Sequence, residues 1–286
     1  MLAHTGLWWA DGHRFVRWNP DSRRIIHETR VSIERARTPR ISRTCTNVRG
    51  HGGVKRSVIL AHAHLRGLPF VARFDVRSYY ESIDHDVLLA IITAANVERA
   101  QAGIVEQYLA IPDVSSKGRG MIAGGSLSHL LGAIYLGPLD QAMEALMEHG
   151  GLYYTRYADD FLIMARTRHL LRRAIAGMHA VLADLRLTVH PEKRFIGRAE
   201  RGCDFLGFTV HPLRRLEPSV VSIQLLGVRA RRLYERGADE DRLRRYVHHW
   251  FTWFTSGLGH LAMPAADETR YWRYALNACT PATTKE

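Results

Sequence analysis

The fold of this chain is decided by the sequence Tyr157-Ala-Asp-Asp160. It stands between two apolar segments, residues 152–156 and 161–164, and this pattern predicts the tight turn of a β-hairpin. Two adjacent carboxylates at a hairpin tip raise one another's pKa, because like charges a few Å apart resist ionising together. A divalent metal ion would stabilise both, but aspartate is also common in ordinary solvated turns. The turn by itself leaves both interpretations open.

A second carboxylate stands in a matching context upstream. Residues 70–76, Phe-Val-Ala-Arg-Phe-Asp-Val, have the composition of a buried strand that carries Asp75 near its end. An aspartate in such an apolar run is costly to leave unpaired. We therefore expect strands ending at Asp75 and at Asp159-Asp160 to converge on one oxygen-rich site, the kind that binds Mg²⁺ and leaves room for substrate phosphates.

With these segments in view, the chain resembles a bacterial reverse transcriptase. Five motifs occur in that family's order and with family-like spacing, and chance agreement of this extent is very unlikely. They are Phe-Asp-Val-Arg-Ser-Tyr-Tyr-Glu-Ser-Ile-Asp-His at 74–85, Gly-Gly-Ser-Leu-Ser at 124–128 followed by Leu-Leu-Gly-Ala-Ile-Tyr-Leu at 130–136, Tyr-Ala-Asp-Asp at 157–160, Leu-Thr-Val-His-Pro-Glu-Lys at 187–193, and Asp-Phe-Leu-Gly-Phe at 204–208.

The resemblance implies an α+β right-hand polymerase fold, in which the palm is an antiparallel sheet backed by helices. The expected domains are a basic N-terminal extension at 1–40, fingers and palm (the reverse transcriptase domain) at 41–210, and a helical thumb at 211–286. Within them, residues 54–65 are expected to form a helix, and a cap followed by an amphipathic helix is expected from Ser82.

The resemblance also implies catalysis with two Mg²⁺ ions, or with Mn²⁺ in their place. The metal ligands would be Asp75, the backbone carbonyl of Val76, Asp159 and Asp160. Lys193 stands where the family has a lysine near the leaving pyrophosphate, and it would donate a proton or neutralise charge there. An ordinary exposed loop lysine is the alternative for Lys193.

For the incoming nucleotide, the resemblance implies contacts from Tyr80, Gly124 and Ser128. Tyr80 follows Asp75 by five residues, where the family places an aromatic ring against the sugar. A ring packed against C2′ leaves no room for a hydroxyl group and would favour deoxynucleotides. A core aromatic at a strand-to-helix turn is a compatible interpretation of Tyr80.

Two basic residues of the fingers are candidates for binding the triphosphate. Arg49 lies in a glycine-rich loop, whose exposed backbone N–H groups suit phosphate, and Lys55 lies in the helix that follows. Plain surface cations are the alternative for both. The sequence also departs from the family: Ala123 replaces a glutamine that usually touches the nucleotide, and His129 replaces a proline. These departures imply altered fidelity or unusual template use.

Three tryptophans, Trp8, Trp9 and Trp18, stand in the basic segment 1–40. Aromatic rings among arginines can stack on bases while guanidinium groups hold phosphates. Packing of a small N-terminal extension onto the fingers is the interpretation that we favour here. At the other end, basic amphipathic helices are predicted beyond residue 211, and Arg244 and Arg245 are the candidates for contacts with a nucleic-acid duplex.

The composition agrees with an anionic partner. The formal net charge is +12 and the sequence pI is about 10.0, as in many nucleic-acid-binding proteins. The resemblance implies an RNA template, a DNA or RNA primer and deoxynucleoside triphosphates, and it leaves open a cognate non-coding RNA, an accessory protein and a homo-oligomer. No apolar run approaches the roughly 20 residues needed to span a bilayer, so we expect a cytoplasmic protein without a membrane partner. The three cysteines show no metal-ligand or disulfide spacing.

The function expected from the sequence is RNA-directed DNA polymerisation, in which deoxynucleotides are added to a primer 3′ end. A retron enzyme is disfavoured because the thumb region lacks Val-Thr-Gly, and a complete group II intron protein because the expected C-terminal domains are missing. An antiviral-defence, diversity-generating or group II-like stand-alone enzyme remains open. The alternatives are a defence polymerase with an unusual template or none, and a non-catalytic RNA-binding scaffold, against which three converging carboxylates argue.

Overall fold

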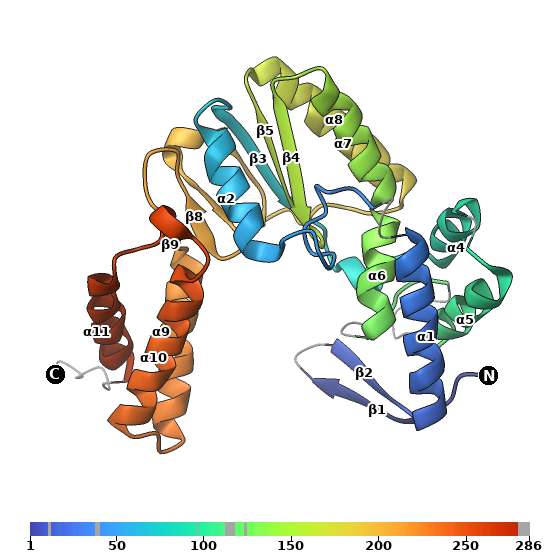
Figure 1. Cartoon of the computed structure of the whole chain (residues 1–286), viewed down its shortest axis with the longest axis horizontal. Coiled ribbons are helices and arrows are strands. Elements are labelled where there is room, and N and C mark those ends of the chain that lie inside the picture. Colours follow the sequence, from blue (N-terminus) through green and yellow to red (C-terminus); the bar gives the residue numbers. More distant parts are fainter. Residues whose placement is uncertain (11–12, 38–40, 96, 112–117, 123–124, 280–286) are drawn as a thin grey trace. The chain divides into compact units, whose positions relative to one another are not determined.

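The structure is a computed structural model that describes residues 1–10, 13–37, 41–95, 97–111, 118–122 and 125–279. The chain forms two compact units, one from Met1–Gly53 with Phe70–Ile196 and the other from Val54–Pro69 with Gly197–Glu286. Their helices and strands are labelled in Figure 1. The mixture of helices and antiparallel sheets is the α+β right-hand polymerase fold expected from the sequence.

The first unit is organised around an antiparallel sheet in the order β4-β5-β3-β6. Its strands are β3 (Phe70–Asp75), β4 (Leu152–Tyr157), β5 (Asp160–Ala165) and β6 (Phe195–Arg198). The central strand β5 is buried along nearly all its length, because it has a strand on each side and helices packed on the sheet. The predicted hairpin and the predicted strand ending at Asp75 are therefore confirmed.

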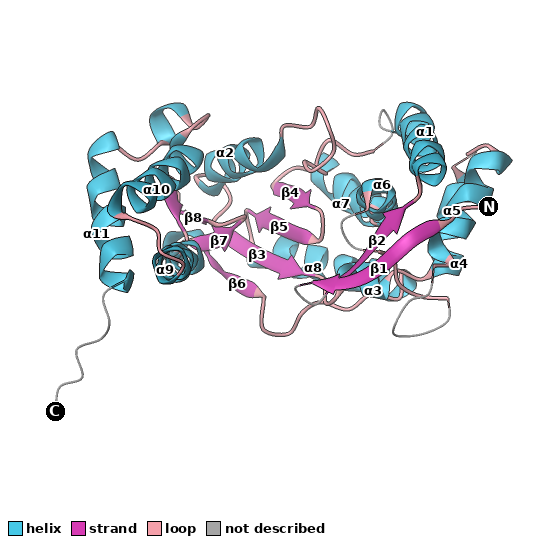
Figure 2. Cartoon of the chain, turned by 90° about the horizontal axis from the view of Figure 1, so that it is seen from below, coloured by secondary structure: helices cyan, strands magenta, loops and turns pink. Residues whose placement is uncertain are grey.

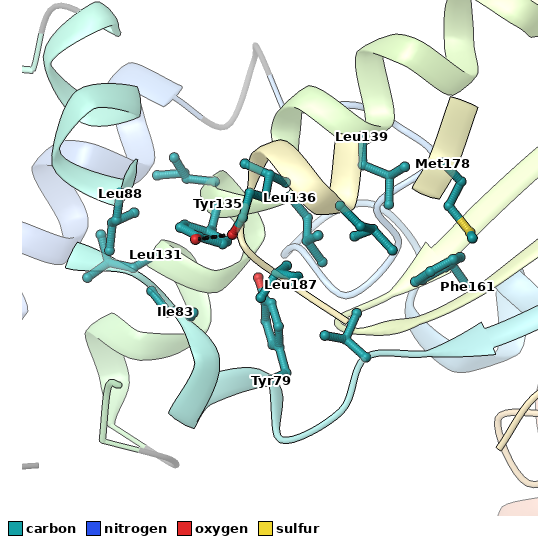
Figure 3. Packing of buried hydrophobic residues seen from close by; sticks show 14 of the residues in the cluster. Tyr79, Ile83, Leu88, Leu131, Tyr135, Leu136, Leu139, Phe161, Met178 and Leu187 are labelled. Atoms are coloured by element: carbon teal, nitrogen blue, oxygen red, sulfur yellow. Dashed lines mark hydrogen bonds between the residues drawn. The ribbon is translucent and has the colours of Figure 1, made fainter. Parts of the chain in front are cut away.

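Two helices pack on this sheet. Helix α7 (Gly137–Glu148) contacts β4, α8 (Arg168–Asp184) contacts β5 and β3, and the two helices contact each other. The Thr167 side chain caps α8 by accepting a hydrogen bond from the Leu170 N–H. Figure 3 shows Leu139 of α7, Met178 of α8 and Phe161 of β5 within one continuous apolar core.

The remaining helices of the first unit extend this core. They are α1 (Pro20–Arg37), α3 (Tyr79–Ser82), α4 (His85–Ala94), α5 (Arg99–Leu109) and α6 (Ser126–Tyr135). Helix α6 is buried along most of its length and contacts α1, α4 and α7. Asp84, rather than Ser82, caps α4, the amphipathic helix expected in this region, because the Asp84 side chain accepts a hydrogen bond from the Val87 N–H.

An N-terminal hairpin of β1 (His4–Ala10) and β2 (His13–Trp18) precedes α1. Figure 2 shows these two strands as a ribbon separate from the central sheet. Trp18, at the end of β2, stacks on Tyr108 of α5 with ring centroids 5.6 Å apart. Trp18 thus packs the hairpin onto a helix of the first unit, and the assignment of that helix to the fingers stays a prediction.

The second unit combines a small sheet with helices. The sheet has the order β7-β8-β9, from Cys203–Phe205, Phe208–Val210 and Glu217–Pro218. The helices are α2 (Gly53–Leu65), α9 (Val220–Glu235), α10 (Glu240–Thr255) and α11 (Glu268–Cys279), with single 3₁₀ turns at Ala199–Arg201, Gly259–Leu261 and Ala265–Asp267. No helix among the described residues is long and apolar enough to cross a bilayer.

The two units group residues by their contacts, and the division into an extension, fingers with palm, and a thumb at residues 40 and 210 stays a prediction. Helix α2, expected to belong to the fingers, groups with the C-terminal helices because its His62 ring bonds the Arg214 carbonyl and its Lys55 side chain lies over Trp253. Residues 197–210 join the same unit because β8 pairs with β9 just before α9.

Candidate active site

The turn Tyr157-Ala-Asp-Asp160, called the carboxylate turn below, joins β4 to β5 through a loop of two residues. Tyr157 and Asp160 are paired across the strands, so Ala158 and Asp159 form the loop. Ala158 has a φ of 55°, in the left-handed region that favours glycine. That conformation costs an alanine roughly 1–2 kcal/mol, so the surrounding structure must hold it in place.

Arg156 is the side chain that holds this turn from behind. Its guanidinium is fully buried and binds Asp140 of α7 through two hydrogen bonds of 2.7 Å. It also donates to the Ala133 carbonyl of α6 at 2.8 Å and to the Ala158 carbonyl at 3.1 Å. Tyr154 adds a further hydrogen bond to Asp140 at 3.0 Å. One cation thus connects two helices to the strained residue of the turn.

The three predicted carboxylates meet at one end of the sheet. Asp75 and Asp160 are paired across β3 and β5, and the Val76 N–H donates to the Asp159 carbonyl at 3.3 Å. Burial raises the pKa of Asp159 to about 6; a backbone hydrogen bond opposes this shift, and the charges of Asp75 and Asp160 add to it. A cation bound at this end of the sheet would therefore stabilise the ionised form of Asp159.

Asp160 differs from Asp159 because it already has a cationic partner. Arg73 of β3 donates to both of its carboxylate oxygens, Nε to Oδ1 at 2.9 Å and Nη2 to Oδ2 at 2.8 Å. Burial raises the pKa of Asp160, and Arg73 opposes that shift. The side chains of Arg73 and Asp160 are both largely shielded from solvent. The two adjacent aspartates thus have different electrostatic surroundings.

The chemistry of the donors suits a magnesium ion that shares its ligands with the substrate. Among the described residues, no group of three or more His, Cys, Asp or Glu side chains is arranged to enclose a metal ion. Asp75 and Asp159 nevertheless offer two carboxylates, while the oxygens of Asp160 are occupied by Arg73. Mg²⁺ in nucleotide enzymes is usually held by one or two carboxylates together with substrate phosphates and water, so this donor set fits it.

Lys193 lies beside the same carboxylates. Its Nζ is 3.6 Å from Asp75 Oδ1, and the side chain is 58% exposed. The loop that carries it is tied to β3 by a 2.7 Å hydrogen bond from the His190 N–H to the Asp75 carbonyl. An exposed ammonium at this position can turn towards an anionic group bound next to Asp75.

Tyr80 packs between the carboxylates and α6. Its ring lies 5.4 Å from that of Tyr79, whose hydroxyl donates to the Gly132 carbonyl at 2.6 Å. A Cβ atom on Gly132 would stand 3.2 Å from Tyr79 and 3.4 Å from Tyr80. Burial, followed by the charge of Asp159, raises the pKa of Tyr80. The ring thus lies near a predicted metal ligand, and glycine at 132 leaves the space that both tyrosines occupy.

In the glycine turn, Gly124 lies outside the described residues. Ser128 is buried at the start of α6, where its hydroxyl bonds the Tyr108 hydroxyl at 2.7 Å and donates to the Ile122 carbonyl. A Cβ atom on Gly125 would stand only 1.9 Å from the Tyr108 oxygen, so a side chain there would displace Tyr108. These contacts fix the start of α6; a direct contact of Ser128 with the nucleotide stays a prediction.

Arg49 and His129 both line a cavity of about 210 Å³ in the first unit, together with Arg30. The His129 ring lies 3.1 Å from the Asn47 carbonyl oxygen and from its side-chain amide nitrogen. Arg49 lies in the expected glycine-containing loop, next to Gly50, which has a positive φ. A contact between Arg49 and a triphosphate stays a prediction. Ala123 lies outside the described residues.

Lys55 belongs to the second unit and has an aromatic environment there. Its Nζ lies 4.5 Å from the ring centroid of Trp253 and 4.8 Å from that of Phe208, and it donates to the Trp253 carbonyl. Burial lowers the pKa of Lys55 to about 8, while the ring faces favour its charged form. In this arrangement the ammonium joins α2 to β8 and α10, and its role towards the triphosphate stays a prediction.

Arg244 and Arg245 lie on the exposed surface of α10. Arg244 pairs with Glu240 at 2.8 Å and stands over the Trp272 ring, 4.6 Å from its centroid. The exposed ion pair is worth little, so Arg244 can exchange Glu240 for a phosphate at small cost. Binding of nucleic acid by the two arginines stays a prediction.

Sequence reasoning missed three contributors to this site: Arg73, the pair of Arg156 with Asp140, and Gly132. Two signals were present. Arg73 and Arg156 are each a lone cation inside a strand that is otherwise mostly apolar, and a buried cation requires a partner. The partners themselves lie 87 and 16 residues away in the chain, beyond the reach of a local pattern.

Comparison with known proteins identifies the family of the chain. A model of the family described as reverse transcriptase (RNA-dependent DNA polymerase) matches residues 21–210. No curated protein matches the sequence. Among solved structures, apo telomerase from Candida tropicalis is 12% identical, with a TM-score of 0.53, and the match covers 100% of this chain and 62% of that one.

Telomerase from Candida albicans in complex with a TWJ fragment of telomeric RNA is 10% identical, with a TM-score of 0.51. The match covers 89% of this chain and 50% of the telomerase chain. At these identities the likeness concerns the fold alone, and this chain spans less than two thirds of either telomerase chain. The family model, in contrast, matches well over half of this sequence. The chain therefore belongs to the reverse transcriptase family.

Proposed function

We propose that this protein is an RNA-directed DNA polymerase that adds deoxynucleotides to the 3′ end of a primer. The observation that carries the proposal is the meeting of Asp75 and Asp159 at one end of the sheet, beside Lys193 and Tyr80. A scaffold that only bound RNA would gain nothing from a carboxylate whose pKa is raised to about 6 by burial and by its neighbours.

In this proposal Asp75, Asp159 and the Val76 carbonyl hold two Mg²⁺ ions, or Mn²⁺, and Asp160 supports them. When bound, the ions would lower the pKa of the primer 3′-hydroxyl, so that its oxygen can attack, and would stabilise the charge on the triphosphate. Arg156 holds the turn that carries Asp159, and Arg73 compensates the charge of Asp160. The protein contributes position and charge, because phosphoryl transfer needs little covalent chemistry from side chains.

Three further residues have roles towards the substrate. Lys193 neutralises or protonates the leaving pyrophosphate, and its 3.6 Å distance from Asp75 supports this role. Tyr80 lies against the sugar and disfavours a 2′-hydroxyl. Arg49 holds phosphates of the incoming nucleotide, in keeping with its place in a glycine-rich loop.

The partners in this proposal are an RNA template and a primer, which the net charge of +12 favours. The motif set supports a bacterial enzyme of the defence-associated, diversity-generating or group II intron-like kind. Sequencing the nucleic acid that copurifies with the protein would identify the template, and would distinguish a cognate non-coding RNA from unrelated cellular RNA.

The test is extension of a DNA primer annealed to an RNA template, with deoxynucleotides and Mg²⁺. The wild-type protein is expected to extend the primer, and Asp159→Ala to abolish extension while keeping the fold. Asp184→Asn, an exposed carboxylate at the end of α8, is the matched control and should retain full activity. Extension by Asp159→Ala at the wild-type rate would remove the carboxylate turn from the mechanism.

A further inference from the structure

The N-terminal hairpin lies before residues 21–210, the segment that the family model matches, and the polymerase reaction proposed above does not use it. Its register defines two faces. Trp8 is paired with Phe15 and Gly6 with Arg17, so these four residues share one face. Leu7, paired with Val16, lies on the other face, because side chains alternate along a strand.

The inner face, which carries Val16 and Trp18, fixes the hairpin to the rest of the unit. Both side chains pack against the apolar core, and Trp18 stacks on Tyr108. The segment before β1 is held as well, since the Leu2 N–H donates to the Gln107 side chain and the Ala3 N–H to Ser22, both at 2.8 Å. The hairpin is therefore a positioned element, although an isolated two-stranded hairpin is only marginally stable.

The outer face presents aromatic rings and a cation to solvent. Trp8 is 44% exposed and is stacked on Phe15, with ring centroids 5.7 Å apart and planes inclined by 17°. The Arg17 guanidinium lies 5.7 Å from the Trp8 ring centroid. Gly6 adds no side chain, and the space above it is open. Within the described part of the chain, Arg17 has no carboxylate at ion-pair distance.

An exposed pair of stacked aromatic rings beside an arginine is typical of surfaces that bind single-stranded nucleic acid. A base stacks on the ring with roughly 1–3 kcal/mol, and the guanidinium holds the adjoining phosphate. A duplex does not offer base faces in this way, and an apolar protein partner would leave Arg17 buried without a counter-charge. A cross-strand aromatic pair that only stabilised the hairpin would contribute roughly 0.2–1 kcal/mol and would not require the arginine.

The hairpin is also linked to the start of α6. Trp18 contacts Tyr108, and the Tyr108 hydroxyl bonds Ser128 at 2.7 Å, in the first turn of α6. Figure 1 shows the hairpin close to α1 and α6 of the same unit. We propose that Trp8, Phe15 and Arg17 form a binding surface for the unpaired RNA template before it enters the active site. This inference rests on the proposed polymerase function for the identity of the RNA.

The first test measures binding without catalysis. A fluorescent, unstructured oligoribonucleotide is titrated with the full-length protein and its anisotropy is followed at several salt concentrations. Trp8→Leu is expected to weaken binding about tenfold, which corresponds to about 1.4 kcal/mol of lost stacking. Trp8→Phe keeps a ring and should retain most of the affinity. Arg17→Gln should lower the slope of log K against log salt by about 0.7.

The second test uses two primer–template duplexes that differ only in the single-stranded 5′ template overhang, one a single nucleotide and one long. Trp8→Leu should raise the KM for the long-overhang template several-fold and leave kcat and the short-overhang template unchanged. An equal loss on both templates would indicate a structural role only and would overturn the proposal, as would wild-type oligonucleotide affinity in Trp8→Leu. A shift in oligomeric state, measured by sedimentation, would assign the face to a second copy instead.

The two proposals fail in different ways. If the wild-type protein does not extend primers, the anisotropy titration still tests the hairpin, because it requires neither deoxynucleotides nor a metal ion. If primers are extended normally by Trp8→Leu on both templates and RNA binding is unchanged, the hairpin proposal is wrong and the polymerase function is unaffected.

Discussion

Arg73 and Asp160 form a two-hydrogen-bond ion pair, at 2.9 and 2.8 Å, between neighbouring strands of the central sheet. Asp159, the adjacent residue, has no comparable arginine among the described residues and has a raised pKa. The two aspartates of the turn are therefore not equivalent. Asp160 is paired with an arginine of the same sheet, whereas burial and the charges of Asp75 and Asp160 disfavour the ionised form of Asp159.

The first prediction concerns this ion pair. Arg73→Gln should lower the free energy of unfolding by about 2–3 kcal/mol, because it leaves the shielded Asp160 carboxylate without its partner. The double variant Arg73→Gln with Asp160→Asn should recover much of that loss. Urea denaturation measures both. A double variant as unstable as the single one would show that Arg73 acts through other contacts.

The second prediction separates positioning from stability at Arg156. Removing either member of its pair with Asp140 should destabilise the protein by about 3–5 kcal/mol, since a buried charge is left alone. The neutral double variant Arg156→Met with Asp140→Asn should fold well and still lose most of its kcat, because the Ala158 carbonyl loses its donor. The KM for primer–template should not change. Wild-type kcat in the stable double variant would contradict a positioning role.

The third prediction concerns the space behind Tyr80. Gly132→Ala places a methyl group against Tyr79 and Tyr80, and we expect the less buried ring of Tyr80 to be the one that moves. The ratio of deoxynucleotide to ribonucleotide incorporation should therefore change. Tyr80→Ala should lower that ratio several-fold, and in its background Gly132→Ala should have no further effect. Incorporation of matched nucleotides on one template measures these ratios.

Gly103→Ala is the control for this series. Gly103 also lies inside a helix, but an added Cβ atom there would meet nothing within 4 Å. It should stabilise the protein by about 0.5–1 kcal/mol through helix propensity and leave nucleotide choice unaltered. An equal change of discrimination in both glycine variants would show that the effect does not pass through Tyr80.

The fourth prediction follows from the pKa of Asp159, which rises from 3.8 to about 6 in the folded protein. Between these values the folded state binds more protons than the unfolded chain, so this carboxyl group lowers stability as the pH rises through the window. In metal-free buffer, Asp159→Asn should therefore be more stable than wild type above about pH 6, by up to about 3 kcal/mol. Below pH 3.8 the difference should vanish.

Urea denaturation at the two pH extremes, with a chelator present, measures this difference. Because the same variant should be inactive, the result would also show that the site is electrostatically strained before its cation binds. An equal stability difference at both pH values would mean that Asp159 is not perturbed by its surroundings.

The sequence alone determined the parts of the site that depend on local pattern. The apolar arms around Tyr157-Ala-Asp-Asp160 formed the predicted hairpin, and the run ending at Asp75 formed the strand beside it. Helix 54–65 also appeared, as α2 at Gly53–Leu65. Alternation, apolar length and turn residues are properties of neighbouring residues, so they can be recognised without knowing what packs against them.

Only the tertiary structure decided which charged and polar side chains meet. Asp160 is held by a residue 87 positions away, and Lys55 donates to a carbonyl 198 positions away, in an aromatic environment that its helical sequence did not indicate. The tertiary structure also determined that Trp8 is exposed whereas Trp18 packs on Tyr108. Such partners are fixed by the packing of whole elements, because a buried charge or ring is satisfied by whatever the fold places next to it.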